Sequence, residues 1–190
     1  MAESDAQELC QSLLATELPR RWAHCAGVAR QARAVGQVLT GWDELIESAA
    51  WLHDIGYASP LAYTGFHPLD GARHLRDQGF GERALWTLVA HHTCALVEAE
   101  ERGLGEALST EFPIEDVDPI AVAALTYCDM TTDPDGHLVD VDERIAEILV
   151  RYPPDDVVHR SISRAAPQLR AQVAEIRAIV DGAGAAEGPP

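Results

Sequence analysis

Histidine and aspartate side chains in apolar surroundings are the groups of this sequence best suited to chemistry. In the segment WLHDIGY, His53 directly precedes Asp54, and in LTYCDMTT, Asp129 follows an apolar run. Imidazole suits Fe, Mn, Co, Ni or Zn, and a carboxylate can bridge two cations. Because neighbouring residues on a helix point about 100° apart, two metal ions share His53 and Asp54 more easily than one ion is chelated by both. The chain contains eight histidines: His24, His53, His67, His74, His91, His92, His137 and His159.

The elements that carry these residues are expected to be helices. Apolar residues recur at helical spacing nearly everywhere, and no segment alternates convincingly as a strand would. The sequence predicts a single all-α domain over residues 1–180, with about seven to nine helices and a disordered tail over residues 181–190. After a first helix near the N-terminus, the expected helices span residues 20–39, 43–55, 67–79, 81–99, 119–130, 141–151 and 155–179. Residues 100–118 are expected to form a loop with one short helix.

The helix that carries His53 and Asp54 is expected to stop directly after them. Gly56 follows two residues later, and glycine is the residue type that tolerates a left-handed position at the end of a helix. The chain would then turn away, which would leave the His-Asp pair accessible to a ligand.

Three segments of this chain resemble the HD-domain superfamily of metal-dependent phosphohydrolases. They are RWAHCAGVAR, AAWLHDIGY and HPLDGARHLRDQGF, the last followed by LVAHHT, and the tetrapeptide HDIG itself names a subgroup of the superfamily. The resemblance extends from about residue 18 to residue 135 and implies the all-α HD fold. Its ligand-type residues occur in the order His24, His53, Asp54, His67, His92 and Asp129.

The resemblance also implies a dinuclear metal site. A first ion would be held by His24, His53, Asp54 and Asp129. Asp54 would bridge to a second ion bound by His67 and His92, and both would be divalent transition-metal ions such as Fe, Mn, Co or Ni. Single-metal members of the family lack counterparts of His67 and His92. We prefer His92 to His91 as the ligand, because related dinuclear members present one histidine directly before a small hydroxyl residue, as in His92-Thr93.

The residues that would bind a phosphate depart from the family pattern. Many members have lysine directly after HDIG, whereas Tyr57 stands there in this chain, which contains no lysine. Phosphate binding is therefore expected from the metals, from neutral donors or from arginine. The candidate substrate-binding residues are Tyr57, Arg21, which lies one turn before His24, and Arg73, which follows His67 on the same expected helix.

The reaction implied by this resemblance is hydrolysis of a phosphoester. Two divalent ions lower the pKa of a bridging water and stabilise the in-line transition state. Asp54 would act in catalysis as the bridging ligand. A proton donor to the leaving oxygen is expected to be His91 or a protonated aspartate near the site. The expected substrate is a nucleotide or another small phosphorylated metabolite.

Two other functions fit the same residues. Some dinuclear HD relatives resemble inositol oxygenase and phosphonate-cleaving oxygenases, which use this ligand order with two irons and O₂. The absence of lysine counts mildly against them, because the oxygenases of this type use lysine or other basic residues near the substrate. A third alternative is a non-catalytic HD module that only binds a ligand, which the retention of all six ligand-type side chains argues against.

The charge of the chain limits its partners and its compartment. The formal net charge is −17, with fourteen arginines against 31 acidic residues, and residues 98–143 hold fourteen of those acids and one arginine. This argues against duplex nucleic acid and anionic membrane as partners, since both need a basic surface. The N-terminal segment has no signal-peptide pattern, and four cysteines without a disulfide framework fit a cytoplasmic protein. The sequence does not determine an oligomeric state.

Overall fold

The computed structural model describes residues 3–186, and the side chains of residues 5–183. This part of the chain consists of helices joined by turns and loops. Within that range there is no β-strand, so the all-α prediction is confirmed. The helices are α1 (Glu3–Leu14), α2 (Pro19–Gly36), α3 (Asp43–Leu52), α4 (His67–Asp77), α5 (Arg83–His91), α6 (Ala95–Glu101), α7 (Gly105–Glu111), α8 (Pro119–Met130), α9 (Val141–Arg151) and α10 (Val157–Ala186). Short 3-10 turns lie at η1 (Ile55–Tyr57), η2 (His92–Cys94) and η3 (Ile114–Asp116).

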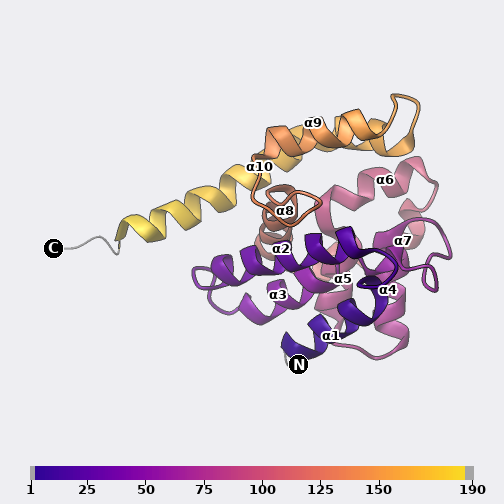
Figure 1. Cartoon of the computed structure of the whole chain (residues 1–190), viewed down its shortest axis with the longest axis horizontal. Coiled ribbons are helices and arrows are strands. Elements are labelled where there is room, and N and C mark those ends of the chain that lie inside the picture. The colour runs from indigo at the N-terminus through magenta and orange to yellow at the C-terminus, as the bar shows by residue number, and fades with distance from the viewer. Residues whose placement is uncertain (1–2, 187–190) are drawn as a thin grey trace.

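Helices α1 to α8 pack around one large apolar core, to which Ile176 of α10 also belongs, and we call these eight helices the body (Figure 1). Helix α8 lies in the interior of the body, because its sequence PIAVAALTYCDM is apolar and small on nearly every face. Its first turn is fixed by the carboxylate of Asp118, which accepts from the Ile120 backbone N–H at 2.9 Å. The buried α8 residues Ala124 and Leu125 belong to the same core as Cys25 and Val28 of α2 and Ala49 of α3. The helices that carry the candidate ligands are therefore held in place by close packing around a common core.

Helices α9 and α10 form a second, smaller core that we call the α9–α10 segment (Figure 1). Ile145 and Ile148 of α9 pack against Leu169 and Val173 of α10, and Met130 at the end of α8 joins them. Ion pairs add to this contact on the outside, among them the pair from Arg170 Nε to Asp142 Oδ1 at 2.6 Å. The α9–α10 segment thus packs against the C-terminal end of α8 and covers one side of the body.

The C-terminal end of α10 differs from the sequence prediction. A disordered tail was expected from residue 181, whereas α10 continues in helical form through Ala186. Residues 181–186 (DGAGAA) contain three alanines, which favour a helix, and two glycines, which disfavour it, so composition alone does not set the end of α10. Residues 187–190 lie outside the described part of the chain.

Gly56 has a different role from the expected left-handed helix cap. Gly56 is not among the residues with positive φ, and α3 ends at Leu52, before a turn and η1. The backbone of η1 instead crosses the start of α4 at very short range. A Cβ atom at Gly56 would lie 2.1 Å from the His67 carbonyl oxygen and 2.7 Å from the Gly71 nitrogen. Glycine is required because any side chain would force η1 away from α4.

The expected single helix over residues 81–99 is broken in the structure. Helix α5 ends at His91, and α6 begins only at Ala95. Between them, Thr93 (φ 51°) and Cys94 (φ 56°) adopt left-handed conformations, which are strained for residues other than glycine. At this break the Thr93 side chain reaches Asp129 of α8, and the His92 ring lies against His67 of α4. Sequence periodicity did not reveal it, because neither glycine nor proline marks the position.

Within residues 3–186, no helix combines the length and the apolar character needed to span a bilayer.

Candidate metal centre

The structure brings all six expected ligand residues together at the junction of five elements. His24 lies on α2, His53 directly follows α3, and His67 is the first residue of α4. His92 comes from η2 and Asp129 from the last turn of α8. Five of the six are buried, and His67 is partly buried. We call this set the His/Asp cluster: His24, His53, Asp54, His67, His92 and Asp129.

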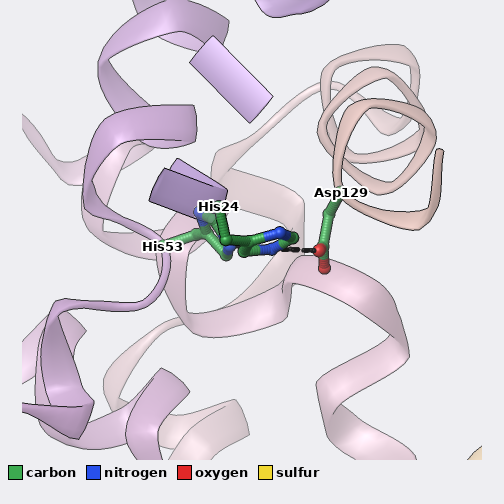
Figure 2. A group of neighbouring side chains, drawn as sticks. All are labelled: His24, His53 and Asp129. Carbon is green, nitrogen blue, oxygen red and sulfur yellow. Dashed lines mark hydrogen bonds and ion pairs between the residues drawn. The ribbon is translucent and has the colours of Figure 1, made fainter. Parts of the chain in front are cut away.

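One half of the cluster consists of His24, His53 and Asp129, with ligand-type atoms that all lie within 4.8 Å of one another. His24 Nε2 is 2.9 Å from Asp129 Oδ1, and His53 Nε2 is 4.0 Å from the same oxygen. Figure 2 shows both imidazoles pointing toward the carboxylate from the side of α2 and α3. The Nε2 atom of His53 is buried and has no hydrogen-bond partner among the described residues. A buried polar atom of this kind needs a ligand, and a metal ion is one that it suits.

The other half consists of Asp54, His67 and His92, again within 4.8 Å of one another. His67 Nε2 lies 3.2 Å from Asp54 Oδ1 and 3.2 Å from His92 Nε2. Asp54 also faces the first half, because its Oδ2 is 3.5 Å from His53 Nε2. Asp54 therefore stands between the two triads, as a bridging carboxylate would.

Backbone carbonyls fix the orientation of three of the four histidines. The Nδ1 atoms of His24, His53 and His92 lie 2.9, 2.8 and 2.7 Å from the carbonyl oxygens of Asp133, Ala50 and Val89. Since a carbonyl only accepts, each Nδ1 carries a proton. The rings of His53 and His92 can then present a lone pair at Nε2, whereas Asp129 raises the pKa of His24 despite burial and favours a proton on its Nε2, which a metal ion would replace. Such lone pairs point at carboxylates and at one another in this cluster, an arrangement that repels unless a cation lies between them. The donor set therefore fits divalent transition metals.

The ionisation states also suit metal ligands. Burial lowers the pKa of His53 to about 4 and that of His67 to about 3, so both rings are neutral at pH 7. Burial acts to raise the pKa of Asp129, but the hydrogen bond with His24 outweighs it, and the pKa falls. The pKa of Asp54 likewise falls well below its usual value, because Arg21 and the adjacent histidines outweigh the effect of burial.

Cys25 lies beside the cluster and forms a third possible group with His53 and Asp54. The thiol is fully buried, and burial raises its pKa well above the usual value, with a further rise from its neighbour Cys10. Only the thiolate is a good metal ligand. Cys25 is therefore a packing residue of the core beneath the site.

Arg21 and Tyr57, two of the three expected substrate-binding residues, lie at the cluster. An Arg21 Nη1 donor pairs with Asp54 Oδ2, and the guanidinium carbon sits 3.6 Å from the centre of the Tyr57 ring. The Tyr57 ring is in turn stacked on His67, with a distance of 3.9 Å between ring centroids. This stack of three side chains holds the cation at the rim of the cluster. Burial raises the pKa of Tyr57, so its hydroxyl remains protonated at neutral pH.

The structure corrects the predictions for His91 and Arg73. His91 points away from the cluster, and its Nε2 lies 2.7 Å from the Phe112 carbonyl oxygen, so the ring is in no position to protonate a leaving group there. The preference for His92 as the residue within the cluster agrees with this geometry. Arg73 lies on the outer face of α4, where Nε donates to Glu111 Oε2 at 2.9 Å. Arg73 lies six residues beyond His67 on α4, and its guanidinium pairs with Glu111 instead of the cluster.

A cleft of about 100 Å³ opens onto the cluster, and sequence reasoning missed several residues of its wall. Thr93 lies beside Asp129 and donates from Oγ1 to Asp129 Oδ2, so it orients that carboxylate. Arg144 and Arg151 enter the wall from α9, and Glu98 from α6. The spacing of Arg144 and Arg151, seven residues apart on one helical face, was a signal in the sequence. What it did not indicate was that this face lies over the cluster.

Comparison with known proteins gives one family match. The family model described as HD domain matches residues 21–128. This range includes five of the six residues of the His/Asp cluster, and the sixth, Asp129, directly follows it. Among curated proteins and among solved structures, no match was found.

Proposed function

The chain belongs to the HD domain family, and on this basis we propose that it is a metal-dependent phosphohydrolase with a dinuclear centre. The observation that supports the proposal most is the pair of His/Asp triads arranged around Asp54. Their imidazole Nε2 atoms converge on two buried carboxylates while the Nδ1 atoms of three rings are held by backbone carbonyls. In this protein class, such an arrangement serves to bind metal ions.

The residues of the cluster divide into two ligand sets. His24, His53 and Asp129 would hold the first ion, and His67 and His92 the second, with Asp54 shared between them. The ions would be divalent Fe, Mn, Co or Ni. When bound, such ions supply an activated water and Lewis-acid stabilisation of the phosphoryl oxygens.

Other side chains of the cleft would bind the phosphate and orient the metal ligands. Arg21 is paired with Asp54 and stacked on Tyr57, so its guanidinium is already oriented toward the position of a reacting phosphoryl group. Thr93 keeps one oxygen of Asp129 engaged, which leaves the other directed at His24. Since His91 lies elsewhere, the leaving oxygen would receive its proton from solvent or from a group bound at the metals.

The expected substrate is a nucleotide or another small phosphorylated metabolite. A cleft of about 100 Å³ suits a phosphoryl group rather than a polymer, and the net charge of −17 disfavours duplex nucleic acid and anionic membranes. All four cysteines are free, which is consistent with the cytoplasmic location that we propose.

A substrate screen tests this proposal. Phosphomonoesters, phosphodiesters and nucleotides are incubated under anaerobic conditions with protein loaded with Mn²⁺, Co²⁺, Ni²⁺ or Fe²⁺, and phosphate release is measured. We expect hydrolysis of at least one class, a decrease of roughly 10³-fold or more in Asp54→Asn, and no change in Asp77→Asn, whose carboxylate is exposed on α4. Oxygen consumption by the iron-loaded protein without hydrolysis of any ester would instead identify an oxygenase.

A further inference from the structure

Two arginines of α9, Arg144 and Arg151, line the cleft opposite the cluster, and the metal centre does not require them. Glu147 lies between them on the same face of the helix and accepts from both. Arg144 Nη1 is 2.6 Å from Glu147 Oε2, and Arg151 Nε is 2.9 Å from Glu147 Oε1. One carboxylate thus serves two guanidinium groups, which leaves an excess positive charge in the wall of the cleft. This is notable in a chain whose net charge is −17.

Arg144 is built into the wall rather than lying on the surface. The residue is only 8% exposed, and its Nε atom is buried without a hydrogen-bond partner among the described residues. A buried guanidinium is unfavourable unless its donors are satisfied. A ligand with several acceptor oxygens would satisfy this donor, and phosphate oxygens match the planar guanidinium particularly well.

The shape of the site indicates where such a ligand would extend. The cleft over the cluster has a volume of about 100 Å³, which is small beside the roughly 300–1,000 Å³ of common small-molecule sites. A groove of about 390 Å³ adjoins it between the start of α2 and α9. Arg21, His24, Arg144 and Arg151 line both. A bound substrate larger than one phosphoryl group would therefore extend from the cleft into the groove, alongside Arg144 and Arg151.

Most acidic groups near the cleft are engaged by other side chains; Glu17, which is exposed and lines the groove, is the exception. Glu98 lines the cleft but is paired with Arg102 at 2.7 Å, and Glu147 is engaged by the two arginines themselves. Asp54 is paired with Arg21, and Asp129 interacts with His24 and accepts from Thr93, so both carboxylates have partners in the metal-free protein. Arg20, at the far side of the groove, is paired with Asp135 at 2.8 Å.

We propose that Arg144 and Arg151 form an anion subsite that binds a second phosphate group of the substrate, one that does not react. The substrate class is then a diphosphate ester, with one phosphoryl group at the metals and its neighbour at α9. Arg144 and Arg151 act as specificity-determining residues. The role of the subsite in a reaction rests on the proposed hydrolase function, whereas its ability to bind an anion does not.

Calorimetric titration of the metal-free, full-length protein with inorganic pyrophosphate tests the subsite directly. We expect wild type to bind, and Arg144→Gln and Arg151→Gln each to bind about tenfold more weakly or worse, since each loses charge-assisted hydrogen bonds. Arg160→Gln is the matched control, because this arginine of α10 is exposed and paired with Glu101, away from the cleft. Circular dichroism checks that each variant keeps the wild-type helix content. Arg151 is partly exposed, so its variant remains informative even if Arg144→Gln does not fold.

Glu147→Gln provides a test of the opposite sign. The change removes the negative charge shared by the two arginines and leaves both guanidinium groups in place, so pyrophosphate should bind several-fold more tightly. A purely structural role of the Arg144–Glu147–Arg151 group predicts no such gain. Absence of pyrophosphate binding in wild type, or wild-type affinity in Arg151→Gln, would overturn the proposal.

Steady-state kinetics separates this inference from the proposed function. With metal-loaded enzyme, Arg151→Gln should raise KM for a diphosphate ester about tenfold and leave KM for a phosphomonoester unchanged. If no ester is hydrolysed but pyrophosphate binding still depends on Arg144 and Arg151, the subsite stands and the hydrolase function fails. If hydrolysis occurs and KM for both esters is the same in wild type and Arg151→Gln, the hydrolase function stands and the subsite fails.

Discussion

The body and the α9–α10 segment face each other across the cleft, and they differ in what they bring to it. The body supplies the His/Asp cluster, and three of its four histidines are held by hydrogen bonds to backbone carbonyls. The α9–α10 segment supplies Arg144 and Arg151, which are held only by a carboxylate of the same helix. The family match covers most of the body and stops before α9.

This difference indicates a division of labour. A metal site needs its ligand atoms in fixed positions, so its residues are placed on closely packed helices. A subsite for a flexible anionic group tolerates more movement, and arginines on a covering helix can provide it. We therefore expect substitutions in the body to affect folding and metal binding strongly, and those in the α9–α10 segment to affect substrate choice with smaller effects on stability.

The largest expected difference is between two glycines, Gly56 in the body and Gly182 in α10. In Gly56→Ala the new methyl group would meet the His67 carbonyl oxygen at 2.1 Å, so we expect a loss of about 3 kcal/mol in the free energy of unfolding. Gly182 is exposed and helical with nothing near its Cβ position, and Gly182→Ala should stabilise α10 by about 0.5–1 kcal/mol. Urea unfolding measures both. Equal changes in the free energy of unfolding for the two variants would contradict the proposed difference in packing between the body and the α9–α10 segment.

A smaller effect is expected at Thr93, which positions a ligand without being one. Thr93→Ala removes the hydroxyl that donates to Asp129 Oδ2, and loss of such a partner weakens metal binding by roughly 10–100-fold. Alanine keeps most of the strain at a φ of 51°, and the variant loses one hydrogen bond to a buried carboxylate, so circular dichroism checks that it keeps the wild-type helix content. Competition with a fluorescent chelator gives the affinity. Thr93→Ser should restore it, and an equal loss in Thr93→Ser would show that the hydroxyl is not the cause.

The smallest effect concerns Glu111 on the outer face of the body. Hydrogen bonds from Arg73, with a further contribution from Arg76, lower the pKa of Glu111 to about 2. Because the folded-state pKa is depressed, the stabilisation is complete above about pH 4.5 and is lost as the pH falls toward 2. Glu111→Gln should lower the free energy of unfolding at pH 7 by less than about 1 kcal/mol, since the groups are partly exposed. The difference from wild type should shrink at pH 3, and a difference that grows there would contradict this account.

The cluster was predicted because the order of its motifs resembles the HD-domain pattern, and several of its residues are also marked locally. His53 and Asp54 stand together at the end of an apolar helix, His67 precedes a proline at the start of the next, and Asp129 ends an apolar run. Helix boundaries place such residues at the same end of a bundle. The order of the motifs along the chain then limits the ways in which they can meet.

The remaining features depend on contacts that the local sequence does not encode. The left-handed turn at Thr93 and Cys94 exists because Thr93 reaches Asp129 on a different helix, and no turn residue announces it. Gly56 was assigned to a helix cap because glycine serves both there and at close backbone crossings. Arg144 was overlooked because only the docking of α9 on the body brings it to the cleft.

The proposed dinuclear centre is tested most directly by counting metal ions. Wild type, His92→Ala and His91→Ala are loaded with Mn²⁺ or Fe²⁺ under anaerobic conditions, desalted, and analysed for metal per chain by mass spectrometry. His91 is the matched control, because it is adjacent to His92 and equally buried but bonds to Phe112 instead of facing the cluster. We expect two ions in wild type and in His91→Ala, and no more than one in His92→Ala. One ion or fewer in replete wild type, or two in His92→Ala, would contradict the account.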